Sequence, residues 1–229
     1  AKPWSGERLY FQGDDYFRDL LKSIRRARRT LDFETYIFEK GRLGDLILST
    51  LAKAASRGVK VRLLVDGIGS PEFAMHYGRL LEQGGIEYRV YRSWPAFLSF
   101  LSRALWFRNL QDFFGHLRRL WSWGTRRAHR NLCIVDGTEA WVGSFNVSDR
   151  HLEGLRGGMA WRDTGIALTG VQSLVFQLAF QLAWEEQLFS SRRSSYKKML
   201  ERWLADDVLE SPVRLNATRR LRRLFNRRL

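Results

Sequence analysis

The amino-acid sequence predicts an α/β fold in which a mainly parallel β-sheet is flanked by helices on both faces. Strand-like and helix-like hydrophobic patterns alternate over residues 14–91, which is typical of such sheets. The strand predicted over 59–65 ends at Asp66 and Gly67, and ligands usually bind at this carboxyl end of a strand in an open α/β sheet. With 229 residues and 45% hydrophobic content, the chain can form a sizeable core. We therefore predict a single domain over residues 1–229.

The first predicted helix begins near Asp14, whose side chain can cap it. Its apolar positions follow the three-four spacing of a helix, at Phe17, Leu20, Leu21 and Ile24. A strand is expected directly after it, over 31–37, and a second helix over 43–57 that a glycine stops. Residues 7–13 resemble the remnant of a protease tag, although 10–17 also read as the entry to the first helix.

The pattern continues along the chain. A third helix is predicted over 73–83, followed by a strand over 86–91. Another strand is expected over 165–168 and a helix over 171–189 that packs on the core. The uncharged stretch 164–184 contains three glutamines and several small polar residues, so strand, turn and helix fit it better than a bilayer span.

The segment 94–123 interrupts this alternation. Nine of its 30 residues are Trp or Phe, and its charged residues are four Arg and one Asp. This composition predicts an interfacial helical insertion, with aromatic rings at the headgroup level and Arg on lipid phosphates. Two other interpretations remain open: a helical subdomain whose aromatic side chains pack inward, and a basic aromatic surface that stacks single-stranded bases. The candidate membrane-contact residues are Trp94, Phe97, Trp106, Phe107, Trp121 and Trp123.

The charge balance predicts an anionic partner. The net charge is +15 and the pI is near 10.7, which favours phospholipid, nucleic acid or another phosphate compound. Seven Arg lie in the basic tail over 212–229, which we expect to lead into a missing second half. The single cysteine, Cys133, excludes an internal disulfide and a cysteine-rich zinc site, and we expect it to fill the core.

The segment from His129 to Asn146 combines an imidazole, a strand, a carboxylate and a Gly-Ser-x-Asn turn in one hairpin-like unit. A histidine can attack the phosphorus of a phosphodiester without a metal ion and so divide one difficult displacement into two steps. The candidate catalytic residues are His129, Asn131, Asp136, Ser144 and Asn146, with Gly143 as a candidate substrate-binding residue.

These residues resemble the pattern His-x-Lys, four residues, Asp, six residues, Gly-Ser-x-Asn of the phospholipase D superfamily, with Asn131 in place of the lysine. The resemblance extends through 34–36, 64–67 and 161–165, and it is closest to the N-terminal half of bacterial cardiolipin synthases. It implies the α-β-α sandwich of that superfamily with one motif over 129–146. A structural histidine is the alternative interpretation, but the fixed spacing of the other motif residues argues against it.

The resemblance implies a role for each candidate and requires no cofactor or metal. His129 would be the nucleophile or the acid facing it, and a histidine from a second motif would protonate the leaving group. Ser144 and Asn146 would hold phosphate oxygens. Asp136 either takes part in this chemistry or orders the strand end. Further substrate-binding candidates are Glu34, which could orient a histidine or cap a turn, Asp66, which could line the pocket mouth or stabilise its turn, and Arg130.

Two departures from the family pattern bear on activity. Asn131 cannot neutralise a phosphate, so it is an engineered inactivation, a natural degeneration, or a variation tolerated because Arg126, Arg127 or Arg130 supplies charge. No second motif occurs, because the remaining histidines, His76, His116 and His151, lack the spacing. The second half-site would come from a missing C-terminal half or from a homodimer partner.

The expected function is that of a phosphatidyltransferase of the cardiolipin synthase type, acting through a phosphohistidine intermediate on an anionic phospholipid such as phosphatidylglycerol. The expected location is peripheral, on the bacterial cytoplasmic membrane. This chain by itself is a candidate for an inactive domain. The alternatives are an endonuclease of the same superfamily, with nucleic acid as the less favoured partner, and a non-catalytic binder of anionic lipid.

Overall fold

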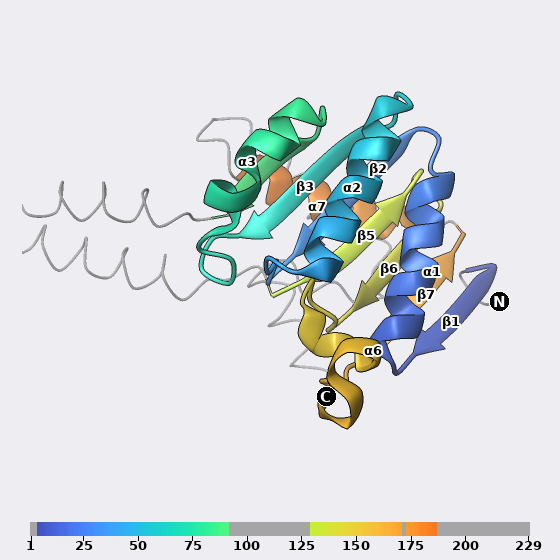
Figure 1. Ribbon diagram of the computed structural model, residues 1–229. Coiled ribbons are helices and arrows are strands. Elements are labelled where there is room, and N and C mark those ends of the chain that lie inside the picture. Colours follow the sequence, from blue (N-terminus) through green and yellow to red (C-terminus); the bar gives the residue numbers. More distant parts are fainter. Residues whose placement is uncertain (1–3, 92–128, 171–172, 187–229) are drawn as a thin grey trace, which may run out of the picture.

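The computed structural model describes residues 4–91, 129–170 and 173–186, which form a seven-stranded sheet with the order β1-β7-β6-β5-β2-β3-β4 (Figure 1). The strands are β1 (Gly6–Tyr10), β2 (Thr30–Thr35), β3 (Lys60–Asp66), β4 (Glu87–Tyr91), β5 (Asn131–Val135), β6 (Glu139–Gly143) and β7 (Gly165–Thr169). The helices are α1 (Gly13–Arg26), α2 (Arg42–Ser56), α3 (Phe73–Gln83), α6 (Glu153–Arg156) and α7 (Ser173–Glu186). Short 3-10 turns cover Asp149–His151 and Gly157–Met159.

The predicted α/β class with flanking helices is confirmed, but the sheet is mixed rather than mainly parallel. β2, β3 and β4 are parallel, as the alternation of strand and helix predicts. β5 runs antiparallel to β2, and β6, β7 and β1 continue the sheet in antiparallel pairs. For β5 and β6 the reason is their connection, which spans only residues 136–138 and is too short for the crossover that parallel neighbours need.

Helices cover both faces of the sheet (Figure 1). α1, α2 and α3 pack on one face, where the buried core includes Phe17, Leu20, Leu51, Leu63 and Phe73. α7 packs on the other face, where the core includes Leu64, Ile134, Ala140, Phe180 and Trp184. Cys133 is 2% exposed and belongs to the first of these cores, which confirms its predicted role as a core residue.

A buried ion pair fixes α7 to the sheet. Arg62 on β3 donates two hydrogen bonds to the carboxylate of Asp32 on β2, at 2.6 and 2.9 Å, and one to Oε1 of Gln181 on α7, at 2.6 Å. The guanidinium also lies 5.0 Å from the ring centroid of Phe180. These three polar side chains lie on the face that α7 covers, so the ion pair helps to anchor the helix to the sheet.

The N-terminal end differs from the sequence-based expectation. Residues 7–13 include all of β1 except Gly6, and β1 pairs with β7 along its whole length and forms an edge of the sheet. Asp14 does not cap α1, because the N-cap position is Gln12 and no side chain caps it. Instead, Oδ2 of Asp14 accepts a hydrogen bond from the backbone N–H of Glu153 at 2.6 Å. Asp14 therefore joins α1 to α6.

The predicted insertion over 94–123, with its candidate membrane-contact residues, and the basic tail over 212–229 lie outside the described residues. Within the part of the chain that the structure describes, none of the helices has the length and apolarity needed to cross a membrane.

Candidate active site

The motif residues converge at one end of the sheet. His129 lies two residues before β5, Asn131 is the first residue of β5, and Gly143 at the end of β6 is the direct cross-strand partner of Asn131. The end of β2 lies on the other side of β5, and an isolated bridge between Phe38 and Val147 ties the chain after β2 to the turn after β6. The sheet topology thus gathers the histidine and the Gly-Ser-x-Asn turn at a common edge.

His129 is exposed, and its ring stacks on the ring of Tyr36. The two centroids are 4.0 Å apart and the planes differ by 21°. Among the described residues no hydrogen bond engages the imidazole nitrogens, so the ring is held by stacking and remains open to an incoming group. An accessible ring nitrogen is one of the conditions for a nucleophilic role.

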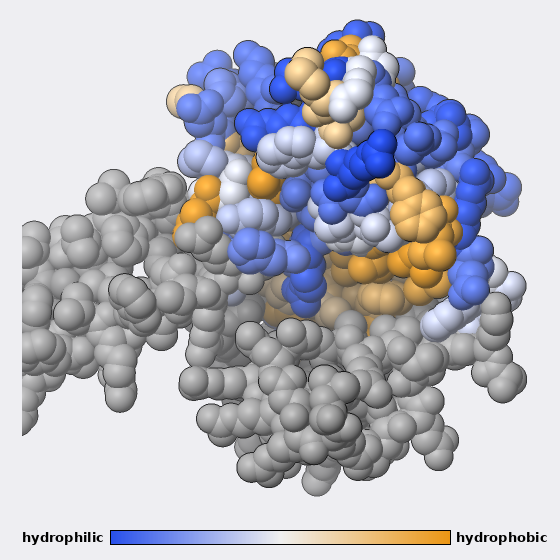
Figure 2. Space-filling model, turned by 90° about the horizontal axis from the view of Figure 1, so that it is seen from below, coloured by the Kyte–Doolittle hydropathy of each residue, from blue (hydrophilic) through white to orange (hydrophobic). Residues whose placement is uncertain are grey.

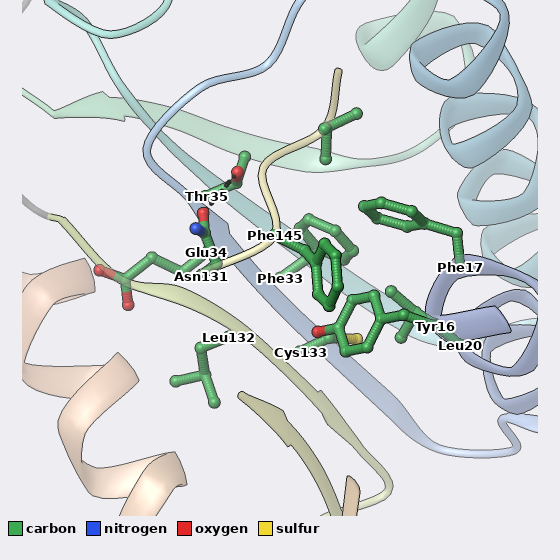
Figure 3. Close-up of a pocket in the computed structure, with 11 residues that line it drawn as sticks. Tyr16, Phe17, Leu20, Phe33, Glu34, Thr35, Asn131, Leu132, Cys133 and Phe145 are labelled. Carbon is green, nitrogen blue, oxygen red and sulfur yellow. Dashed lines mark hydrogen bonds between the residues drawn. The ribbon is translucent and has the colours of Figure 1, made fainter. Parts of the chain in front are cut away.

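Asn131 joins three strand ends and is 8% exposed. Its Oδ1 accepts hydrogen bonds from the hydroxyl of Thr35 at 2.9 Å and from the backbone N–H of Tyr36 at 3.0 Å, and its Nδ2 donates to the carbonyl of Ser144 at 3.2 Å. Figure 3 shows Asn131 and Thr35 side by side at the ends of their strands. The amide that stands where the family has lysine therefore serves as a structural link.

The Gly-Ser-x-Asn turn is built tightly. A Cβ on Gly143 would lie 2.5 Å from the carbonyl oxygen of Thr164, so this position requires glycine. The hydroxyl of Ser144 donates to Oδ1 of Asp163. Oδ1 of Asn146 accepts from the backbone N–H of Ile37 at 3.2 Å, and its Nδ2 donates to the Ser144 carbonyl at 3.3 Å. These contacts hold the turn against the chain after β2.

Asp136 lies at the opposite end of β5, about 16 Å from Asn131 at the usual rise per strand residue. Its carboxylate accepts hydrogen bonds from the backbone N–H groups of Arg28, Arg29 and Thr30, at distances between 2.7 and 3.2 Å. Burial acts to raise its pKa, but these donors outweigh burial and lower it. Asp136 adopts a φ of 52° at the start of the hairpin turn. The structure does not bring it to His129 and gives it contacts that order the turn.

Glu34 and Arg130 form an ion pair on the opposite face of the sheet from Asn131. Nε and Nη2 of Arg130 both donate to Oε1 of Glu34, at 3.0 and 2.9 Å. Glu34 is almost fully buried, and within the described residues its Oε2 has no hydrogen-bond partner. Burial raises the pKa of Glu34, Arg130 opposes this, and the nearby Asp66 adds to it. In Figure 3 the Glu34 side chain points away from the cluster of aromatic rings that includes Tyr16 and Phe145.

This pairing bears on the missing lysine. Neighbouring positions on a strand point to opposite faces, so Arg130 and Asn131 diverge. The charge of Arg130 is directed at Glu34 and is not available where the family lysine would stand. Arg126 and Arg127 lie outside the described residues.

Asp66 accepts hydrogen bonds from the backbone N–H groups of Ile68 and Gly69, at 2.9 and 3.0 Å, which matches the expected turn-stabilising role.

The cavity drawn in Figure 3 lies between α1 and strands β2 and β5. Its volume is about 10 Å³ and most of its lining residues are apolar, among them Tyr16, Phe33 and Phe145. Such a space holds at most about one water molecule, so it is a packing defect and no substrate pocket. Among the described residues, no three His, Cys, Asp or Glu side chains lie close enough to hold a metal ion.

The motif pattern by itself does not mark Tyr36 and Asp163 as site residues, although both lie within segments that resemble the family. Tyr36 directly follows Glu34-Thr35 at a strand end, and Asp163 belongs to the segment 161–165. Their roles depend on contacts between segments far apart in the chain, such as the 19-residue separation of Ser144 and Asp163. No periodicity in the sequence indicates such contacts.

A sheet of this topology, with His-x-Asn and Gly-Ser-x-Asn at one edge, defines a domain of the phospholipase D-like class. Residues 20–156 match the family described as cardiolipin synthase, PLD-like domain. A cardiolipin synthase of Staphylococcus aureus (strain Mu50) is 32% identical over 181 residues, which cover 79% of this chain and 32% of the relative. A cardiolipin synthase of Clostridium perfringens (strain SM101) is 28% identical over 176 residues, covering 77% of this chain and 32% of the relative.

A solved structure shows the same fold. The phospholipase D family member Nuc from Salmonella typhimurium matches with a TM-score of 0.54 at 17% identity, covering 79% of this chain and 94% of that chain. The chain belongs to the cardiolipin synthase, phospholipase D-like domain family, as the motif predicts. It spans about a third of the length of the curated relatives that it matches.

Proposed function

We propose that this domain is one half of a phosphatidyltransferase of the cardiolipin synthase type, which transfers a phosphatidyl group from a phospholipid to an alcohol. The observation that supports this most is the accessible imidazole of His129 at the end of the sheet where Asn131 contacts the Gly-Ser-x-Asn turn, in a chain of this family. The similar curated proteins carry the name cardiolipin synthase.

In the proposed reaction a ring nitrogen of His129 attacks the phosphorus, and the bond from phosphorus to the leaving alkoxide breaks. A second histidine gives its proton to that alkoxide. The same histidine later takes the proton of the incoming alcohol, whose oxygen displaces the His129 nitrogen. Water in place of the alcohol would make the reaction a hydrolysis. Ser144 and Asn146 would hold the phosphate oxygens as charge develops on them.

The second histidine is proposed to come from outside this motif, because the motif occurs once among the 229 residues. It would be supplied either by a further part of a longer polypeptide or by a second copy of the chain across a two-fold axis. The chain by itself is therefore expected to turn over substrate only at background level.

A second candidate function is non-catalytic binding of anionic lipid. The hydrogen bonds of Asn131 favour it, because this residue is committed to the fold and leaves the site without the family's cation. Removing one preorganised group of this kind typically lowers a rate on the order of 10² to 10³-fold.

We also propose that the segment 150–162 contacts the membrane surface next to the site. This segment leaves large apolar side chains in solvent, with exposed fractions of 38% for Leu155, 79% for Met159 and 48% for Trp161. Arg156 and Arg162 are exposed in the same segment. Apolar side chains at the headgroup boundary, together with Arg on lipid phosphates, stabilise peripheral binding. Figure 2 views this end of the molecule and shows hydrophobic residues among strongly hydrophilic ones.

The position of this segment supports the proposal. It follows the Gly-Ser-x-Asn turn directly, and Asp163 at its end accepts the hydrogen bond of Ser144. A bilayer that contacts the segment would present phospholipid headgroups to His129. We therefore propose a peripheral location on the bacterial cytoplasmic membrane, with phosphatidylglycerol as the anionic lipid.

Vesicles and plasmid DNA test the main proposal. The chain, alone and within a protein that carries both motifs, is incubated with phosphatidylglycerol vesicles and with plasmid. New cardiolipin without nicked plasmid supports the transferase, and nicking without lipid turnover overturns it in favour of a nuclease. Lipid binding with background turnover in every form, including Asn131→Lys, supports the binder. A phosphorus adduct should be trapped on His129, should persist in His76→Gln, and should disappear in His129→Gln.

Two exposed methionines offer a matched test of the membrane contact. Met159 is 79% exposed beside the site, and Met75 is 74% exposed on α3. Met159→Gln should weaken sedimentation with phosphatidylglycerol vesicles several-fold, whereas Met75→Gln should not. Equal effects of the two substitutions would refute the assigned surface.

A further inference from the structure

His151 lies five residues after Asn146 and is in direct contact with it. The imidazole is fully buried, and its Nε2 accepts a hydrogen bond from the backbone N–H of Asn146 at 3.3 Å. The rings of Phe145 and Trp161 meet it edge-on, with centroids at 5.4 and 5.8 Å. These contacts fix both the position of the ring and the direction in which Nε2 points.

The hydrogen bond from Asn146 determines the tautomer. Because Nε2 accepts, the proton of the neutral ring must lie on Nδ1. Nδ1 has no hydrogen-bond partner in the described part of the chain, and Oδ2 of Asp163 lies 3.7 Å away, beyond hydrogen-bond distance. The other oxygen of Asp163 accepts from the hydroxyl of Ser144. His151 and Asp163 therefore hold the two ends of the Gly-Ser-x-Asn turn.

We propose that His151 is a positioning residue that holds the Gly-Ser-x-Asn turn in its phosphate-binding form only while its imidazole is neutral. Protonation would place a hydrogen on Nε2, facing the N–H of Asn146, so the turn would lose its acceptor. The consequence for phosphate binding rests on the proposed function, in which this turn holds the phosphate oxygens.

The charged groups around the ring set the direction of its titration. Asp163 faces Nδ1 from the loop before β7, and Glu39 lies nearby on the chain after β2, where it pairs with Arg150 at 3.2 Å. Asp149 is engaged by the backbone N–H groups at the start of α2, and Asp14 by that of Glu153. Burial lowers the pKa of His151, and although the nearby backbone of Trp161 and the carboxylates of Asp163 and Glu39 act to raise it, burial prevails.

The sign of the pH effect follows. A histidine whose folded-state pKa lies below its unfolded value of about 6.5 stabilises the fold fully above that pH. The stabilisation is lost as the pH falls toward the folded-state pKa. The turn should therefore be ordered at neutral pH and should loosen in acid.

Three substitutions test the proposal with a soluble phosphodiester, glycerophosphoglycerol, as the probe. His151→Gln retains an acceptor near the Nε2 position but does not titrate, whereas His151→Phe retains the shape without an acceptor. At pH 7.5 His151→Gln should bind like the wild type, and His151→Phe should bind on the order of ten-fold more weakly, as expected for one lost acceptor. His76→Gln, on the exposed surface of α3, is the control and should change nothing.

The pH profile separates His151 from His129. Every other group that titrates is common to the wild type and His151→Gln, so its effect cancels in the ratio of their affinities. The wild-type affinity divided by the His151→Gln affinity should therefore fall as the pH drops below about 6.5 toward the lowered folded-state pKa of His151. A constant ratio would overturn the proposal.

A measurement without ligand distinguishes a failure of the positioning role of His151 from a failure of the proposed function. Imidazole ¹⁵N shifts should show Nδ1 protonated and Nε2 unprotonated at neutral pH, and the Asn146 amide resonance should move with the titration of His151. The opposite tautomer, or an Asn146 resonance that does not follow His151, would refute the positioning role. If both NMR results are as expected and no variant binds the phosphodiester, the proposed function fails while His151 retains its role in the turn.

Discussion

Replacement of Asn131 by methionine tests whether this residue links the strand ends. The substitution removes an acceptor from the hydroxyl of Thr35 and from the backbone N–H of Tyr36, and a donor from the carbonyl of Ser144. The Thr35 hydroxyl is also 3.0 Å from the carbonyl of Ile37, and the Ser144 carbonyl also accepts from Asn146. The main loss is therefore the acceptor of the Tyr36 N–H, a partly buried hydrogen bond, and leaving such a donor without a partner costs about 1–3 kcal/mol.

Asn131→Lys is the matched comparison, because lysine and methionine have similar reach and both lose the amide. We expect the free energy of unfolding to fall by about 2 kcal/mol in both variants. Only the lysine should increase the affinity for phosphatidylglycerol vesicles, by about ten-fold or more, since hydrogen bonds to charged groups contribute about 1.5–3 kcal/mol. Restoring the family's cation thus costs stability, which sequence comparison does not reveal.

Urea unfolding followed by circular dichroism measures the first effect, and vesicle sedimentation measures the second. An unfolding free energy for Asn131→Met within about 0.5 kcal/mol of the wild type would refute the linking role. Equal vesicle affinities for the lysine and methionine variants would refute the assignment of this position to the phosphate site.

Three further predictions concern residues to which the structure gives a role in stability and not in the proposed reaction. Asp136→Asn should lower stability by about 1–2 kcal/mol and leave vesicle binding unchanged, because Asp136 lies at the far end of β5; weaker binding by a stable variant would contradict this. Arg62→Met should destabilise the fold by about 3–5 kcal/mol, since it leaves Asp32 buried without its partner, and Asp32→Leu in the same chain should recover much of that loss in urea unfolding; no recovery would argue against the pair. The raised pKa of Glu34 means that the folded state keeps this proton to higher pH than the unfolded state, so stability should fall as the pH rises above about 4.3, and Glu34→Gln should flatten that fall; an unchanged slope would assign it to another group.

Much of the fold could be predicted because it is encoded in local patterns. The helix predicted over 73–83 is α3 with the same bounds, and the strands predicted over 59–65 and 86–91 are β3 and β4 within one residue. These segments carry the hydrophobic periodicity of their own structure, and glycines follow the helices. β1 carries no such pattern, since three of its five residues are exposed and it is defined only by its pairing with β7.

The candidate site could be predicted only in part. The spacing from His129 to Asn146 indicates the motif, and the family match confirms the family. The spacing cannot show that Asp136 lies far from His129. The two residues belong to one motif, but the five-residue strand β5 lies between them. It also cannot show that Arg130 is directed at Glu34, a contact between residues 96 positions apart.

The sequence by itself determined the class of fold, the family, the motif and the loss of its lysine, because these depend on residue type and on spacing within short segments. Only the tertiary structure decided which face each side chain occupies and which partner it meets. It placed Asn131 in a structural link, stacked His129 on Tyr36, and set His151 against the turn that contains Asn146. The physical reason is that hydrogen bonds and burial depend on distances between strand ends, and those distances exist only once the sheet has formed.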